Sequence, residues 1–204
     1  MALSAAEIER GVKHLRRADP VLRKVIRRAG PFTLKLRHDR FQALVFSILS
    51  QQISGKAAAA IRKKLMDRVG PDGLTPENMA SLPIEELRSI GLSKQKASYI
   101  HDLAARVREG TLPLRGLARL PDDDVIEALV QVKGIGVWTA HMFLIFSLGR
   151  LDVMPHGDYG VRSAIQKLYA LQELPDRATC HRIAEPWRPY ASIAAWYCWR
   201  SLDF

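Results

Sequence analysis

Apolar residues recur at helical spacing along almost the whole chain. The clearest stripe is Phe41, Leu44, Val45, Ile48 and Leu49, which falls on one face of a helix. Further helices are expected over 4–17 and 20–29, between Ser54 and Gly70, between Ser93 and Gly110, from Pro121 to the glycines at 134 and 136, on to about Leu148, through Val161 to Leu168, and on either side of Pro186–Pro189, with short helical turns after Thr75 and Pro83. Only 32–37 alternates as a strand would. The expected fold is all-α, with about ten helices.

The helical pattern breaks on two glycines in Lys133-Gly134-Ile135-Gly136 and resumes at once. Two helices must therefore be joined by a short hairpin. Glycine can take a positive φ and lets a ligand approach the backbone closely. Backbone amides at the start of the next helix favour an anion such as phosphate. A tight corner between two helices, without a ligand, is the alternative interpretation.

The charge balance favours an anionic partner. The 204 residues include 31 Lys and Arg against 21 Asp and Glu, a net charge of +10, which suits a polyanion, although a basic surface also serves solubility alone. Two cysteines exclude a disulfide framework and a four-cysteine cluster. The N-terminus is unlike a signal peptide, and no apolar run has membrane-spanning length. We therefore expect an intracellular protein with no membrane partner.

Several motifs accompany the hairpin. Lys133–Ala140 is followed by Asp152-Val153 and Gly157-Asp158-Tyr159. The others are Phe41–Val45, Ile48–Ser54, Gly91–Ala97 and Trp187–Tyr190. Together they resemble the helix-hairpin-helix (HhH-GPD) superfamily of DNA glycosylases, and within it the alkylation-repair branch, 3-methyladenine DNA glycosylase II. The motifs are specific only in combination, and the resemblance covers the chain from about residue 20 onward.

The resemblance implies one glycosylase domain over 1–204, in a compact form without an additional N-terminal β-rich domain. This domain would consist of two helical lobes with a DNA-binding cleft and the active site between them. One lobe would span about 39–149, including the hairpin, and the other about 1–38 plus 150–204.

Asp158 matches the catalytic aspartate of this superfamily. Cleavage of an N-glycosidic bond builds positive charge on the sugar, as in glycoside hydrolysis, and a carboxylate can stabilise that charge or orient the attacking water. A purine alkylated at N3 or N7 is already cationic and leaves as a neutral base, so one acid suffices. The alternative is that Asp158 only N-caps a helix that starts at Tyr159.

Trp138 bears on whether the DNA strand is also cut. In bifunctional members of the superfamily, the second residue after the last hairpin glycine is a lysine that forms a Schiff base. Trp138 stands at this position and has no amine for imine chemistry. The four-cysteine iron–sulfur motif of the endonuclease III branch is absent as well. The resemblance therefore implies a monofunctional enzyme without lyase activity.

Other site residues follow from the same resemblance. An enzyme that acts on a base in a duplex must flip it out. Gln52 aligns with the residue that fills the gap, unless its loop is only a polar turn. Trp138, Tyr159 and Trp199 are candidates for the base pocket, since aromatic faces attract a cationic purine, although core packing explains a single tryptophan nearly as well. Phosphate contacts are expected from Lys133, Gly134, Ile135, Gly136 and Thr139.

The combined prediction is a DNA glycosylase that hydrolyses alkylated purines, such as 3-methyladenine or 7-methylguanine, out of double-stranded DNA. It would leave an abasic site and start base excision repair. We expect a monomer, in the cytoplasm at the nucleoid if bacterial and in the nucleus if eukaryotic. No cofactor or catalytic metal is expected, although relatives can hold a monovalent cation on hairpin carbonyls. Two alternatives stay open: a non-catalytic hairpin module that grips DNA, and a glycosylase for mismatched or oxidised bases.

Overall fold

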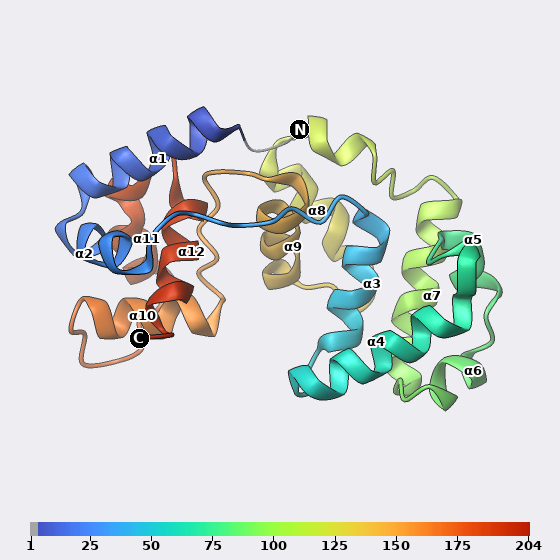
Figure 1. Cartoon of the computed structure of the whole chain (residues 1–204). Coiled ribbons are helices and arrows are strands. Elements are labelled where there is room, and N and C mark those ends of the chain that lie inside the picture. Colours follow the sequence, from blue (N-terminus) through green and yellow to red (C-terminus); the bar gives the residue numbers. More distant parts are fainter. Residues whose placement is uncertain (1–3) are drawn as a thin grey trace. The chain divides into compact units, whose positions relative to one another are not determined.

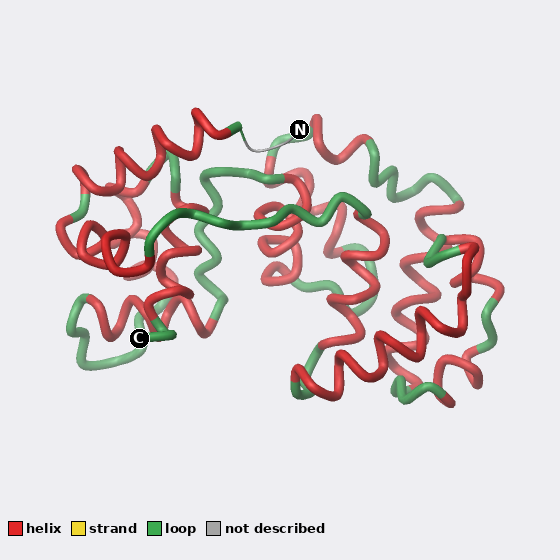
Figure 2. Tube along the Cα trace, in the orientation of Figure 1, coloured by secondary structure: helices red, strands yellow, loops and turns green. Residues whose placement is uncertain are grey.

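The computed structural model describes residues 4–204, and every regular element among these residues is a helix (Figures 1 and 2). The twelve α-helices within residues 4–204 confirm the all-α prediction. They include α5 (Pro76–Ser81) and α6 (Ile84–Ser89), which the sequence indicates only as helical turns. Residues 32–37 form neither helix nor strand. None of the helices within residues 4–204 combines the length and the apolar character needed to cross a membrane.

The chain divides into two compact units. The terminal unit consists of Met1–Leu36 and Leu144–Phe204, and the central unit is Arg37–Phe143. The second break falls inside the helical run that the sequence assigns to one lobe. There α9 (Val137–Phe143) continues directly into a π-helical turn, Leu144–Leu148. The apolar periodicity of the sequence does not reveal this boundary. The helical backbone continues through it, and only the residues that pack against the helix change.

The terminal unit is built around its last helix, α12 (Ala191–Ser201). This helix contacts α1 (Ala5–Ala18), α2 (Pro20–Ala29) and α10 (Tyr159–Leu168). The unit also contains the π-helical turn Leu144–Leu148, α11 (Arg177–Ala184) and a 3-10 turn, Glu185–Trp187. Because α12 packs on several sides, nearly all of its residues are apolar or small, and most are buried.

A buried carboxylate ties the first helices of this unit to its C-terminal part. Asp19 is 5% exposed and N-caps α2, since its Oδ1 accepts hydrogen bonds from the amides of Val21 and Leu22. Its Oδ2 accepts from the hydroxyl of Tyr169 and from Nε1 of Trp187 at 2.8 Å. These donors offset the cost of burying the charge.

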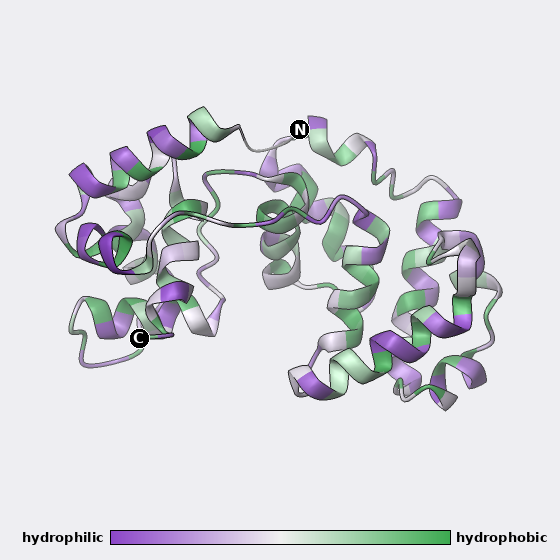
Figure 3. Cartoon of the chain, viewed as in Figure 1, coloured by the Kyte–Doolittle hydropathy of each residue, from purple (hydrophilic) through white to green (hydrophobic). Residues whose placement is uncertain are grey.

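The central unit is organised around α7 (Lys94–Arg108), which contacts α3 (Arg40–Ser50), α5 and α6. The other helices of the unit are α4 (Gly55–Val69), α8 (Asp122–Val130) and α9, with 3-10 turns at Gly70–Asp72 and Gly116–Arg119. Figure 3 shows α3 as hydrophobic over most of its length, whereas α1 alternates between polar and apolar residues. The stripe predicted from Phe41 to Leu49 is buried as expected.

Candidate active site

Asp158 is held at the N-terminus of α10 by two hydrogen bonds to the same oxygen. Its Oδ1 accepts from the amide of Val161 at 2.8 Å and from the indole Nε1 of Trp199 at 2.8 Å. Asp158 is therefore the N-cap of α10, and the residue is only 9% exposed. Capping does not exclude a catalytic role, because both functions require an oriented carboxylate.

A glycine makes room for this arrangement. A Cβ on Gly160 would lie 3.1 Å from Oδ1 of Asp158 and 3.1 Å from Cδ1 of Trp199. Such a distance is tighter than normal van der Waals contact. Trp199 also stacks on Phe146, with ring centroids 5.5 Å apart and an interplanar angle of 29°. Phe146 and Gly160 together keep the indole N–H directed at the carboxylate.

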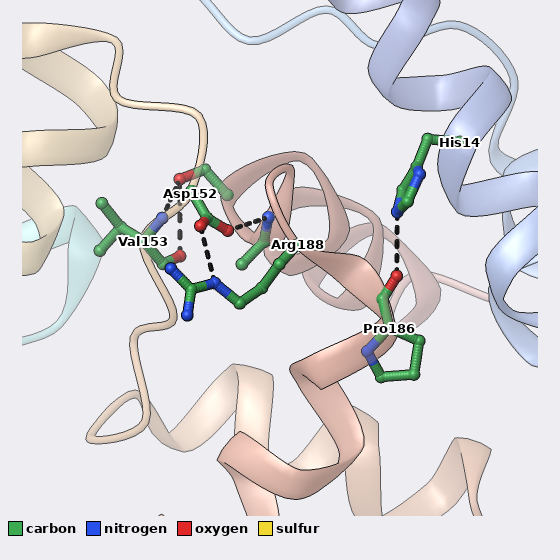
Figure 4. A network of polar contacts seen from close by, with 7 residues as sticks. His14, Asp152, Val153, Pro186 and Arg188 are labelled. Atoms are coloured by element: carbon green, nitrogen blue, oxygen red, sulfur yellow. Dashed lines mark hydrogen bonds and ion pairs between the residues drawn. The ribbon is translucent and has the colours of Figure 1, made fainter.

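The loop that carries Asp158 is anchored to the start of α12 (Figure 4). Arg188 Nε donates to Asp152 Oδ2 at 2.9 Å, and the amide of Ala191 donates to Asp152 Oδ1 at 3.3 Å. One step further along the loop, the amide of Val153 donates to the buried hydroxyl of Ser192 at 2.9 Å. The motifs around 152 and 188, which lie far apart in the sequence, thus contact one another directly.

The two hairpin glycines have different reasons to be glycine. Gly134 has φ +80, and a Cβ there would lie 2.1 Å from Cδ2 of Tyr99. Gly136 is not among the glycines with positive φ, and a Cβ there would meet no atom within 4 Å. Of the two glycines, only Gly134 uses the positive φ that glycine allows, and the carbonyl of Gly136 accepts the first hydrogen bond of α9, from Ala140.

Asp102 on α7 holds the hairpin through a hydrogen bond to its backbone. Its Oδ2 accepts from the amide of Lys133 at 3.0 Å and from Nε of Arg106 at 3.0 Å. Burial raises the pKa of Asp102, but these hydrogen bonds and the charges of Arg106 and Lys133 outweigh it, and the pKa lies below its ordinary value. The side chain of Lys133 stays 69% exposed, with Nζ 4.0 Å from Asp102 Oδ1.

Two residues of the expected phosphate-binding set point inward. Thr139 is 3% exposed and Ile135 is 4% exposed. The side chain of Thr139 therefore belongs to the packed side of α9, and that of Ile135 is a core residue of the corner. This leaves Lys133 and the backbone of the two glycines as the accessible part of the hairpin.

The loop after α3 presents Gln52 at its tip. Gln52 is exposed and has φ 54, an uncommon conformation for a residue with a side chain. Its neighbour Gln51 is the C-cap of α3 and donates from Nε2 to the carbonyl of Gly134 at 2.8 Å. Lys96 of α7 donates from Nζ to the carbonyls of Leu49 at 2.9 Å and Gln51 at 2.6 Å. The loop after α3 is thus fastened both to the hairpin and to α7.

The sequence of this chain matches a known family across these elements. Residues 45–189 match the HhH-GPD superfamily base excision DNA repair proteins. The chain belongs to this superfamily. The matched region includes the loop after α3, the hairpin and Asp158.

Solved structures and a sequence relative match this chain over nearly its whole length. The 3-methyladenine DNA glycosylase Mag1 of Schizosaccharomyces pombe, in complex with abasic DNA, has a TM-score of 0.86 at 30% identity, over 96% of this chain and 97% of that one. A DNA-3-methyladenine glycosidase of Bacillus halodurans has a TM-score of 0.84 at 38% identity, over 94% and 88%. DNA-3-methyladenine glycosylase 1 of S. pombe is 32% identical over 98% of this chain and 88% of its own length.

The aromatic residues expected in a base pocket differ in their surroundings. Trp199 and Tyr159 belong to the same unit of this HhH-GPD protein as Asp158, and Tyr159 is 73% exposed. Trp138 belongs to the central unit and is 43% exposed. Trp199 has a contact that the sequence does not reveal, because its N–H is directed at the proposed catalytic carboxylate.

Sequence reasoning missed several residues that hold these segments in place. They are Lys96, Tyr99 and Asp102 in the central unit and Gly160 in the terminal unit. Lys96 lies in the motif Gly91–Ala97, which was a signal that this turn of α7 matters but not of what it contacts. Gly160 follows Asp158 closely, yet the need for glycine arises only from the position of Trp199 on α12.

Proposed function

We propose that this protein is a monofunctional DNA glycosylase that removes alkylated purines from duplex DNA and leaves an abasic site. The observation that carries this proposal is Asp158, a carboxylate 9% exposed that is oriented by the amide of Val161 and the indole of Trp199. Membership of a base excision repair superfamily and the similarity to 3-methyladenine DNA glycosylases support it.

The proposed reaction needs one carboxylate and one water. As the bond between C1′ and the base nitrogen breaks, positive charge develops on the sugar, and Asp158 stabilises it. Removal of the carboxylate from bulk water strengthens this attraction. The water oxygen bonds to C1′, and its proton passes to Asp158. A purine alkylated at N3 or N7 departs as a neutral base, so no general acid is required.

In the proposed function, the hairpin binds the phosphate backbone of the DNA. Lys133 is exposed beside the hairpin, and the backbone at Gly136 is open to an incoming group. Phosphate contacts of this kind position the duplex without reading its sequence. Gln52, exposed at the tip of its loop, fills the space left by the flipped nucleotide.

Trp138 supports hydrolysis without strand cleavage. A covalent lyase mechanism requires an amine that attacks C1′ and forms a Schiff base. The second residue after Gly136 is Trp138, and an indole cannot form an imine. A flat, 43% exposed ring is instead suited to stack on a cationic base.

The test is base release from DNA that contains 7-methylguanine or 3-methyladenine, measured in single turnover. Asp158→Asn should lower the rate by roughly a hundredfold or more, because the charge that stabilises the transition state is lost. Asp176→Asn is the matched control, since Asp176 also N-caps a helix, α11. Equal rates for the wild type and Asp158→Asn would refute the enzymatic proposal. A covalent adduct trapped by borohydride would refute the monofunctional one.

A further inference from the structure

One face of α7 contacts both segments that bind DNA in the proposed function, the loop after α3 and the hairpin. Lys96, Tyr99 and Asp102 follow one another at three-residue spacing, so they share a face of the helix. Lys96 contacts the wedge loop, which we define as Gln51–Ile53, and the other two contact the hairpin. A single rigid helix therefore supports both segments.

Lys96 holds the base of the wedge loop. Its ammonium bonds the carbonyls of Leu49 and Gln51, at 2.9 and 2.6 Å, where α3 ends. A cation at a helix C-terminus is favourable because the last carbonyls lack helical partners. Burial lowers the pKa of Lys96. The ammonium is thus partly desolvated, and its two short bonds restrict the backbone just before Gln52.

Tyr99 and Asp102 hold the hairpin through a ring contact and a hydrogen bond. The ring of Tyr99 lies against Gly134 so closely that no side chain fits there, and Gln95 donates to its hydroxyl at 2.5 Å. Asp102 accepts the amide of Lys133 at 3.0 Å. The hairpin backbone therefore contacts α7 at two successive residues, Lys133 and Gly134.

Gln51 links Lys96 to the hairpin. Its carbonyl accepts from Lys96 and its side-chain amide donates to the carbonyl of Gly134 at 2.8 Å. Gln52 follows in a positive-φ conformation, which is strained for a residue with a Cβ. Such a conformation persists when neighbouring contacts fix it.

We propose that Lys96 is a positioning residue for base flipping, which acts through Gln51 to set the Gln52 wedge at a fixed place relative to the hairpin. This inference rests on the proposed function, since it takes Gln52 as the wedge and the hairpin as the phosphate grip. Lys96 itself touches no DNA in this role. Its loss leaves the grip on the backbone intact and impairs insertion of the wedge.

The experiment uses Lys96→Met, which keeps the length of the side chain and removes the ammonium. Lys94→Met is the matched control, because Lys94 is exposed on the same helix and its loss changes the net charge equally. The duplex carries a non-cleavable abasic analogue next to 2-aminopurine, whose fluorescence rises when the wedge unstacks it. We expect Lys96→Met to lower the insertion rate by roughly ten- to hundredfold, with unchanged affinity for undamaged duplex, and Lys94→Met to insert like the wild type.

Two further variants keep the test decisive. Gln51→Ala keeps the carbonyl that accepts from Lys96 and removes the side-chain bond to the carbonyl of Gly134, so it breaks the connection between the wedge loop and the hairpin. It should also lower the insertion rate, even if Lys96→Met folds poorly. Lys96→Arg should restore much of the insertion rate, because a guanidinium can still donate to both carbonyls. In the background of Gln52→Ala, Lys96→Met should add no further loss.

The inference is overturned if Lys96→Met and Gln51→Ala insert at the wild-type rate, or if the losses from Lys96→Met and Gln52→Ala add. It also fails if Lys96→Met weakens binding to undamaged duplex as much as insertion. Because the abasic analogue is not cleaved, the signal does not depend on base release. A wild type that inserts normally but releases no alkylated base would refute the proposed enzyme and leave the positioning role of Lys96 supported.

Discussion

At the scale of single residues, Asp158 combines two tasks. As the N-cap of α10 it satisfies a backbone amide, and in the proposed function the same carboxylate stabilises charge on the sugar. The indole of Trp199 shares Oδ1 with that amide. The cap makes the position of the carboxylate independent of any substrate, so it costs no reorganisation when the reaction occurs.

The hydrogen bond from Trp199 should affect the rate of base release. Trp199→Phe keeps an aromatic ring against Phe146 and removes the N–H. A hydrogen bond to a charged group contributes about 1.5–3 kcal/mol, so we expect a rate about tenfold or more below that of the wild type. Single-turnover release from 7-methylguanine DNA measures it. Trp196→Phe, the same change on the same helix, is the control, and equal rates for both variants would contradict the orienting role of the indole.

At the scale of elements, the two glycines of the hairpin have different surroundings. Gly134 is constrained from inside the protein, by its φ of +80 and by the ring of Tyr99. Gly136 is constrained by nothing within 4 Å in its own unit or elsewhere among the described residues. In the proposed function, a phosphate approaches the backbone at Gly136, where the missing Cβ leaves open space.

Alanine substitutions should separate these two roles. Gly134→Ala should lower the free energy of unfolding by about 2–4 kcal/mol, from backbone strain and the clash with Tyr99. Gly136→Ala should cost about 1 kcal/mol or less, as expected at an N-cap position, yet weaken binding to duplex DNA of any sequence. Urea unfolding and fluorescence anisotropy measure the two quantities. Normal DNA binding by Gly136→Ala would remove the phosphate role from its backbone.

At the scale of the whole molecule, the net charge of +10 is the property most relevant to a DNA partner. Affinity for a polyanion gains from counterion release and falls as salt rises. The charge is spread over many lysines and arginines, so it predicts a long-range attraction rather than a site. In the proposed function, Lys133 adds a local phosphate contact to this long-range attraction.

Salt titration should resolve that local contact. Replacing Lys133 with alanine should reduce the slope of log affinity against log salt by about one, equally for unrelated sequences, because a phosphate contact reads no base. Lys24→Ala on α2 removes the same charge elsewhere and serves as the control. A loss confined to one sequence would show that Lys133 contacts a base edge instead.

The sequence by itself determined the helical fold, the hairpin and the acid at the start of α10. These features are local: apolar spacing specifies a buried helix face, glycines specify the corner, and the identity of Trp138 already excludes an amine at its position. The same local pattern could not place the second break between the units, because the helical run from 137 continues through it.

Only the tertiary structure decided which side chains hold these features in place. Asp158 meets Trp199, Gly134 meets Tyr99, and Gln51 meets Lys96, in each case across a long stretch of chain. Periodicity reports that a residue faces inward or outward, whereas a hydrogen bond depends on the packing of two helices and on one rotamer of each partner. The hairpin and the acid were therefore visible in the sequence, and the contacts that position them were not.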